Sequence, residues 1–362
     1  METVNTGWQE YEIMNGSQKA AEICKNGMCR IYQEKMLPYN LYLEEVSEDD
    51  IDGRVQNLEN FYHWCSSRIL TLDREYAKEI LNSIGASQAT TDRERARIAL
   101  SYHCLSLMDI FWTKEKAEEQ NFSEINLFEN HLDCAFVDVS LRGRQMTIQN
   151  RYMIADDLGT KGCYPKAWIR DENGFKLLKD GGREPVENEL LASRIARCFR
   201  VNQVEYDGQK VTASRIITSL SQSIVPMEYF EIYAANHETG TMDYVLRLDG
   251  YGYYMMNIID YLVGNTDRHW GNWGILVDNR TNQPVRLYDL MDFNKAFQAY
   301  DSLEGANCLT TSARMTQKEA AEAAVREIGL NQMGEVKPEW FVEKAVGEMF
   351  FKRLEVLKEA AK

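Results

Sequence analysis

The stretch that decides the fold is residues 264–293, which read GNTDRHWGNWGILVDNRTNQPVRLYDLMDF. An apolar run at residues 253–263 precedes it, and this run is typical of a helix. Residues 273–277 and 284–288 are strand-like and flank a polar turn, which predicts a hairpin. The stretch therefore predicts a helix, a polar loop and a strand pair, in that order.

The polar loop carries side chains suited to phosphate transfer. Asp267 and Asn272 have the spacing D-x-x-x-x-N, and Asp289 follows the second strand. In kinases the first acid orients the acceptor hydroxyl, while the amide and a second acid hold magnesium against the phosphates. The competing interpretation is a structural loop, because Asp and Asn are common turn formers. The match in a single span favours the phosphotransferase, provided that a nucleotide-binding half lies upstream.

Length, charge and cysteine content limit the class of protein. A chain of 362 residues is long enough for two or three domains or for one two-lobed fold. The net charge of −15 argues against direct nucleic-acid binding, because phosphate contacts need clustered Lys and Arg. We expect a cytoplasmic protein without a membrane segment, since there is neither a long apolar run nor a signal peptide. The eight cysteines form no C-x-x-C pair, which fits reduced thiols.

The first 146 residues are predicted to form a helical N-terminal region. Apolar residues recur at helical spacing within residues 41–83 and again within residues 92–107. No functional motif is recognisable in this region, so its role stays open.

From about residue 147 the pattern changes to short strands, as expected for a nucleotide-binding sheet. A turn with Gly159 and Gly162 precedes a predicted strand pair at residues 167–170 and 174–179. Kinases use such a turn to cover the phosphates, although two glycines alone are equally typical of a plain hairpin.

Two lysines of the second strand, Lys176 and Lys179, are candidates for contacting phosphate. Their odd spacing places them on opposite faces of a strand, so only one can point toward the nucleotide. A helix is predicted after residue 182, and Glu189 in its first turns can hold that lysine, as the helix Glu of kinases does. The alternatives are that Glu189 only complements the helix dipole, or that Glu187 is the partner.

The small sheet is predicted to end with a strand over residues 223–230. A segment that joins two lobes at this place would use its backbone to bind adenine, with Met227 and aromatic neighbours as walls.

Taken together, residues 152–297 resemble the kinase core of the HipA-like serine/threonine kinases, bacterial toxin-type kinases distantly similar to phosphoinositide 3/4-kinases. NTDRHWGN at residues 265–272 and YDLM at residues 288–291 carry the resemblance. The shorter matches LLK, ENE and EYF end at Lys179, Glu189 and Phe230.

The resemblance implies an α+β, two-lobed protein-kinase-like fold with an added helical region at residues 1–146. Its N-lobe, with a small antiparallel sheet, would span residues 147–232. Its mainly helical C-lobe would span residues 233–362.

The resemblance also implies the roles of individual residues. The implied catalytic residues are Asp267, His269, Lys179 and Glu189. The implied nucleotide contacts are Gly162, Lys179, Glu228, Phe230, Asn272 and Asp289, of which Asn272 and Asp289 are the magnesium ligands. His269 is expected to brace the loop, because imidazole is a poor ligand for magnesium. Thr160, in the glycine turn, is the expected site of autophosphorylation.

The resulting expectation is an ATP- and Mg²⁺-dependent serine/threonine protein kinase that phosphorylates a protein hydroxyl. Its expected partners are ATP, a protein substrate and an antitoxin-like protein. The alternatives are a kinase of a lipid or small molecule, or a nucleotide-binding pseudokinase scaffold. The complete set of lysine, acids and amide argues against the scaffold.

Overall fold

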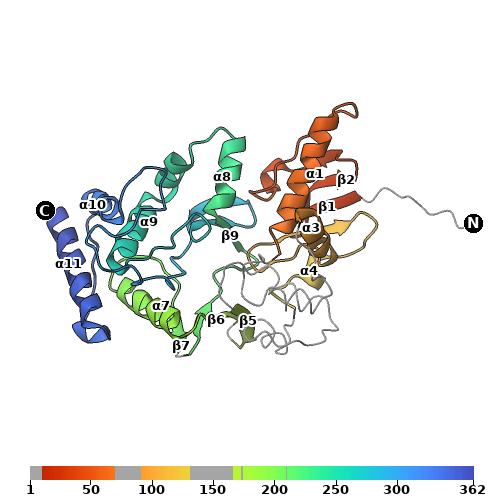
Figure 1. The fold of residues 1–362 in the computed structure, drawn as a ribbon. Helices are drawn as coiled ribbons and strands as arrows, with labels where there is room; N and C mark the ends of the chain where they lie inside the picture. Colours follow the sequence, from red (N-terminus) through yellow and green to blue (C-terminus); the bar gives the residue numbers. More distant parts are fainter. Residues whose placement is uncertain (1–9, 70–90, 131–165, 173, 209) are drawn as a thin grey trace, which may run out of the picture. The chain divides into compact units, whose positions relative to one another are not determined.

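The computed structural model describes residues 10–69, 91–130, 166–172, 174–208 and 210–362 (Figure 1). The chain forms two compact units. The first contains Met1–Arg170 together with two short segments, Thr218–Ser223 and Asp278–Gln283. The second contains the remaining residues up to Lys362.

A four-stranded antiparallel sheet with the order β3-β2-β1-β4 forms the first unit's framework. The strands are β1 (Glu10–Asn15), β2 (Gln18–Cys24), β3 (Cys29–Ile31) and β4 (Phe111–Glu115). Asn15 pairs with Gln18, so a two-residue turn joins β1 to β2, and Gly16 adopts the positive φ of 54° that such a turn requires. This sheet is a correction to the prediction of a helical N-terminal region.

Helices complete the described part of the first unit. They are η1 (Glu34–Met36), α1 (Ile51–Ser66), α3 (Asp92–Ser101) and α4 (Phe122–Ile125). The helices predicted within residues 41–83 and 92–107 are confirmed over α1 and α3, and residues 70–83 lie outside the described residues. Phe61 of α1 is buried, and its ring centroid lies 5.9 Å from that of Tyr11 on β1. The first unit is therefore mixed α+β.

The turn Asp278–Gln283 is held inside the first unit by Asn282. This side chain is 5% exposed and adopts a positive φ of 52°. Its Nδ2 donates to the carbonyls of Lys35 and Leu37, both at 2.9 Å. The Tyr39 hydroxyl donates to the Asn282 carbonyl at 2.8 Å. Asn282 thus fastens this turn to the chain around η1.

The substitution Asn282→Ala is expected to lower the free energy of unfolding by about 2–4 kcal/mol, because buried carbonyls lose their donor and alanine is strained at positive φ. Asn282→Gly removes only the donor, so its loss should be smaller. Urea unfolding followed by circular dichroism measures both. An alanine variant with the midpoint of the wild type would contradict this account.

A small sheet is present where the sequence predicted one, with the order β5-β6-β8-β7. Its strands are β5 (Lys166–Asp171), β6 (Gly174–Lys179), β7 (Tyr206–Gly208) and β8 (Thr212–Arg215). The predicted strand pair at residues 167–170 and 174–179 is confirmed by β5 and β6. Helix α7 (Arg183–Ala196) follows β6, which agrees with the predicted helix that carries Glu189.

A second sheet, with the order β11-β10-β9, contains the predicted hairpin. Its strands are β9 (Gln222–Pro226), β10 (Gly274–Asp278) and β11 (Gln283–Leu287). Helix α8 (Met227–Asn236) begins directly after β9. The predicted strand at residues 223–230 is therefore wrong beyond Pro226, which occupies the N-cap of α8 with a φ of −53°.

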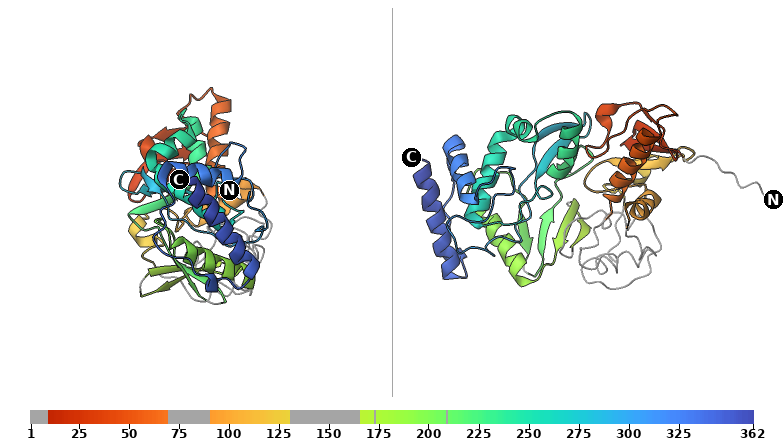
Figure 2. Two further views of the ribbon diagram at one scale, coloured as in Figure 1. Left: turned by 90° about the vertical axis from the view of Figure 1, so that its left-hand side faces the viewer. Right: turned by 45° about the horizontal axis from the view of Figure 1, so that its top comes forward.

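Three helices pack together in the second unit (Figures 1 and 2). They are α9 (Thr241–Val263), α10 (Gln317–Ile328) and α11 (Lys344–Ala360), and the short η2 (Pro338–Trp340) precedes α11. The predicted helix at residues 253–263 is the second half of α9. It ends at Gly264, whose φ of 61° is left-handed and which therefore stops the helix.

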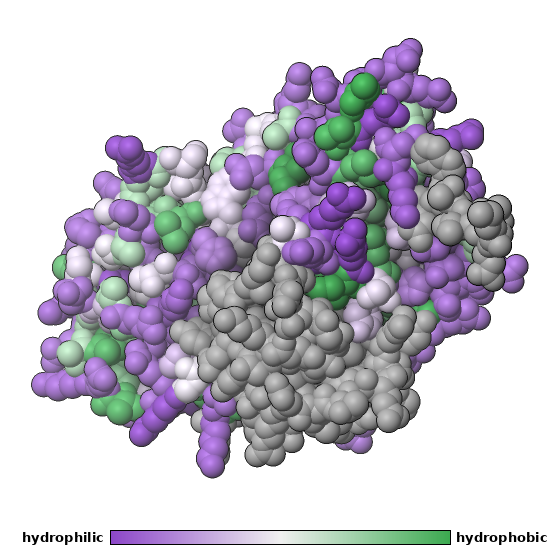
Figure 3. Space-filling model, turned by 45° about the vertical axis from the view of Figure 1, so that its right-hand side comes forward, coloured by the Kyte–Doolittle hydropathy of each residue, from purple (hydrophilic) through white to green (hydrophobic). Residues whose placement is uncertain are grey.

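The predicted α+β class is confirmed by these small antiparallel sheets and helices. The predicted domain boundaries stay predictions, since residue 146 lies outside the described residues and residue 232 falls within α8. Hydrophilic side chains predominate on the face drawn in Figure 3, with smaller apolar groups between them. Among the described residues, no helix combines the length and apolar character that a membrane crossing needs.

Candidate active site

The loop between α9 and β10 is closed by its own hydrogen bonds. The Nδ2 atom of Asn272 donates to the Asp267 carbonyl at 2.8 Å, and the Asn272 backbone N–H donates to the His269 carbonyl at 2.8 Å. The Asp267 N–H donates to Oδ1 of Asn265 at 3.3 Å. Because the amide nitrogen of Asn272 is used in this way, its Oδ1 is left as the acceptor.

Buried contacts of Arg268 hold this loop in place. It is 2% exposed and forms a bidentate pair with Asp260, at 2.8 and 3.1 Å. Its Nη1 also donates to the carbonyls of Asn272 and Met291, at 2.8 and 2.5 Å. Burial would lower the pKa of Arg268, but the Asp260 carboxylate outweighs it and raises the pKa above the ordinary value. Arg268 therefore connects the Asn272 loop to the segment that leads into Asp292.

His269 braces the same loop, as expected from the sequence. Its Nδ1 accepts a hydrogen bond from the Gly271 N–H at 3.1 Å. This contact stabilises the bend between Asp267 and Asn272 and does not by itself assign a chemical role to the imidazole.

Lys179, at the end of β6, is the buried cation of the site. It is 7% exposed, and its Nζ lies 2.9 Å from Oε1 of Glu189 and 3.0 Å from Oδ1 of Asp292. Burial would lower the pKa of Lys179, but the carboxylates of Asp292 and Glu189 outweigh it and hold the pKa well above its ordinary value. Lys179 is therefore charged and fixed by two acids.

The structure shows how the alternative lysines and glutamates are paired. Glu189 is 1% exposed and accepts a second hydrogen bond, from Thr212 at 2.7 Å. Glu187 instead forms an exposed pair with Arg183. Lys176 pairs with Asp171 at 2.9 Å. The contact between Lys179 and Glu189 that the sequence predicted is present.

Asp292 is the site residue that the sequence reasoning missed. It has a positive φ of 64°, and its Oδ1 accepts from Lys179 and, at 2.8 Å, from Nδ2 of Asn294. Its N–H donates to the hydroxyl of Tyr206 at 3.0 Å, and Lys179 lies over the Tyr206 ring. In protein kinases a magnesium-binding Asp is followed by Phe and Gly, and Phe293 here follows Asp292.

Asp289, the predicted metal ligand, is placed differently. Its Oδ1 lies 2.7 Å from Nη1 of Arg286, which is a residue of β11, the strand that precedes Asp289. Directly after Asp289, Leu290 forms an isolated β-bridge with Gln203. The chain therefore brings Asp292 to Lys179, and Asp289 remains beside Arg286.

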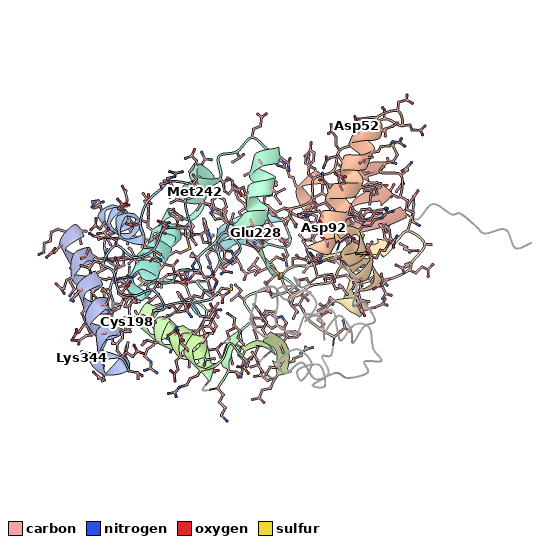
Figure 4. The ribbon with its side chains drawn as sticks, in the orientation of Figure 1. Asp52, Asp92, Cys198, Glu228, Met242 and Lys344 are labelled. Carbon is pink, nitrogen blue, oxygen red and sulfur yellow. The ribbon has the colours of Figure 1, made fainter. Side chains whose placement is uncertain are left out.

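The predicted adenine contacts lie on a helix. Glu228 is in the first turn of α8, where Figure 4 labels it, and its N–H donates to the Trp270 carbonyl at 3.0 Å. Phe230 is fully buried. Backbone groups inside an α-helix bond to one another, so this segment does not present an extended edge to a base. Gly162 and Thr160 lie outside the described residues.

The oxygen atoms of the site suit magnesium. Asn272 and Asp292 offer hard oxygen donors, and Oδ1 of Asn294 is buried without a hydrogen-bond partner. Within the described part of the chain, no cluster of three or more His, Cys, Asp or Glu could hold an ion alone. Magnesium in kinases needs no such cluster, since it binds one or two side chains together with phosphates. The residues present therefore fit a nucleotide-bound magnesium.

Comparison with known proteins agrees with this geometry at the level of the fold. No protein-family model and no curated protein matches the sequence. A solved structure of HipA from Shewanella oneidensis MR-1, in complex with HipB and operator DNA, is similar with a TM-score of 0.52 and 12% identity, over 97% of this chain and 95% of that chain. The Helicobacter pylori proinflammatory kinase CtkA is similar with a TM-score of 0.42 and 14% identity, over 55% of this chain and 90% of that chain. The chain has a HipA-like kinase fold.

Proposed function

We propose that this protein is an ATP- and Mg²⁺-dependent serine/threonine protein kinase. The observation that carries the proposal is the buried Lys179, which contacts Glu189 at 2.9 Å and Asp292 at 3.0 Å. Active protein kinases need this combination of a strand lysine, a helix glutamate and an acid before phenylalanine. Burying a lysine against two acids from distant parts of the chain carries a desolvation cost, which favours a functional role over a purely structural loop.

The roles divide among the residues as follows. Lys179 contacts the phosphates, and Asp267 orients the acceptor hydroxyl and accepts its proton. Asn272 and Asp292 would hold Mg²⁺, so Asp292 replaces Asp289 in this assignment. When bound, the metal neutralises the charge of the transferring phosphate.

Adenine binding is assigned to the segment that follows β8 rather than to Glu228 and Phe230. Strand β8 is the direct neighbour of β6, with Arg215 opposite Lys176. Residues 216–217 continue from β8 in irregular backbone. The Ile216 N–H is bonded to the Phe175 carbonyl at 3.2 Å, so contacts with a base would come from the Ile216 carbonyl and the backbone of Ile217.

The acceptor is proposed to be a serine or threonine hydroxyl of a protein, and a lipid or small-molecule acceptor is the second candidate. The Shewanella structure contains HipA with HipB, and an antitoxin-like partner of this kind is part of the proposal. The net charge of −15 favours contact with proteins over direct contact with nucleic acid.

The experiment is incubation of the purified protein with γ-labelled ATP and Mg²⁺, with and without a cell lysate. Wild-type protein should label itself or a lysate protein, and labelled lipid extracted into organic solvent would favour the second candidate. Asp267→Asn is expected to lower transfer about 100-fold while nucleotide binding is largely kept, because the base is lost but Lys179 and the proposed metal ligands remain. Equal labelling by the variant and the wild type would remove Asp267 from the assignment.

A further inference from the structure

Asp267, the proposed base, is contacted by Lys295, a lysine to which no role has yet been assigned. The Nζ atom of Lys295 lies 2.9 Å from Oδ1 of Asp267. Lys295 follows Asp292 by three residues, so one short segment supplies both the proposed metal ligand and this cation. Hydrogen bonds within the described residues use Oδ1 of Asp267 and not Oδ2. One carboxylate oxygen of Asp267 can therefore accept a hydrogen bond from Lys295 while the other accepts one from a hydroxyl.

The other two cations near the loop are committed to the fold. Lys179 is buried between two carboxylates, and Arg268 is buried against Asp260 and two carbonyls. The side chains of Lys295 and Asp267 are 36% and 25% exposed. Partly exposed ion pairs exchange partners readily, because water compensates the separated charges. Of these three cations, Lys295 has the most exposed side chain.

We infer that Lys295 contacts the transferring γ-phosphoryl group and that Asp267 positions it beside the acceptor hydroxyl. This inference rests on the proposed kinase function. In the transfer, the acceptor oxygen forms a bond to the γ-phosphorus, and the bond from that phosphorus to the bridging oxygen breaks. ADP leaves with the electron pair, and the hydroxyl proton passes to Oδ2 of Asp267. Lys295 keeps its protons and donates hydrogen bonds to the phosphoryl oxygens, where negative charge must be stabilised.

Lys295 should therefore distinguish a triphosphate from a diphosphate. In this assignment, only a triphosphate has a phosphoryl group that would lie near Asp267. The two phosphates of ADP would instead contact Lys179 and the metal. A lysine that merely stabilised the loop would affect both nucleotides alike.

The test compares Lys295→Met and Lys295→Arg with the wild type, using full-length protein with Mg²⁺. Calorimetric titration gives the Kd for ADP and for AMP-PNP, and labelled ATP gives kcat. Lys295→Met should lower kcat about 100-fold. It should weaken AMP-PNP about tenfold and leave ADP within about twofold, since one charged hydrogen bond is lost. Lys295→Arg should restore part of both losses.

The matched control is Lys318→Met. Lys318 forms an ion pair of the same length, 2.9 Å, with Glu304, and lies on α10. It is expected to leave kcat and both Kd values unchanged.

The outcomes separate the two proposals. A wild type that binds neither nucleotide overturns the kinase function and the role of Lys295 with it. A wild type that binds and transfers, with a Lys295→Met variant that keeps its kcat and its preference for AMP-PNP, overturns only the role of Lys295. Equal weakening of ADP and AMP-PNP in that variant also overturns it, because the effect would then be structural.

Discussion

The variant Asp292→Asn is expected to lower phosphate transfer about 10⁴-fold, which corresponds to about 5.5 kcal/mol in the barrier. Asp292 contacts Lys179 at 3.0 Å and is the acid that the chain brings to the proposed phosphate site. An amide keeps the shape of the side chain but removes the charge that would hold Mg²⁺. The variant should also lose most of the Mg²⁺ dependence of nucleotide binding.

The matched control is Asp289→Asn, which removes the other acid of the same segment. Asp289 pairs with Arg286, whereas Lys179 pairs with Glu189 and Asp292, so this change should alter kcat less than about threefold, as a partly exposed ion pair contributes little. Steady-state kinetics and titration of nucleotide at several Mg²⁺ concentrations measure both variants. If Asp289→Asn were inactive and Asp292→Asn active, Asp289 would be the metal ligand, as the sequence pattern suggested.

The two acids show where sequence reasoning reaches its limit. Asp289 and Asp292 stand three residues apart after the hairpin, and either satisfies a pattern of loop, strand pair and acid. The deciding contact is with Lys179, which is 113 residues earlier in the chain. Local patterns carry no information about such a contact. The residue after Asp292 was the available signal, because Phe293 repeats the Asp-Phe order of the kinase motif.

Helices and turns with strong local signals are predicted correctly. The apolar run before Gly264, the turn between β10 and β11 and the helix after residue 182 all follow short-range rules. The strand spacing of Lys176 and Lys179 also fixes which faces they occupy, as the structure confirms. These features depend on neighbours within a few residues, so one sequence is sufficient to predict them.

The N-terminal sheet was missed for a different reason. Asn15-Gly16 is a strong hairpin signal that could have identified β1 and β2. The sheet is completed by β4, which pairs Phe111 with Asn15 from a distant part of the chain. Charged residues also interrupt the alternation of apolar and polar residues along these strands. Glu12 is a buried residue of β1 and forms ion pairs with Lys19 and Lys114. Non-local pairing and buried ion pairs are both invisible to a periodicity rule.

The second large effect is expected at Lys179. Lys179→Met should lower transfer about 10³-fold and weaken ATP binding, because the phosphates lose a fixed charge. It also leaves the buried carboxylate of Glu189 and the partly exposed carboxylate of Asp292 without their cation, so thermal unfolding must be measured alongside activity. Loss of activity in a variant that still unfolds cooperatively identifies a chemical role.

Substitution of two glutamates of α7, Glu189 and Glu187, distinguishes a role in positioning Lys179 from a general effect on folding. Glu189→Gln keeps the side-chain volume and the hydrogen bond to Thr212 but removes the charge that fixes Lys179. It should lower kcat about tenfold to 100-fold, with a smaller change in ATP affinity, since the lysine remains but is held less firmly. Glu187→Gln on the same helix breaks only the exposed pair with Arg183 and should leave the kinetics unchanged. If Glu187→Gln were the damaging change and Glu189→Gln the mild one, the contact between Lys179 and Glu189 would not be the one that operates during transfer.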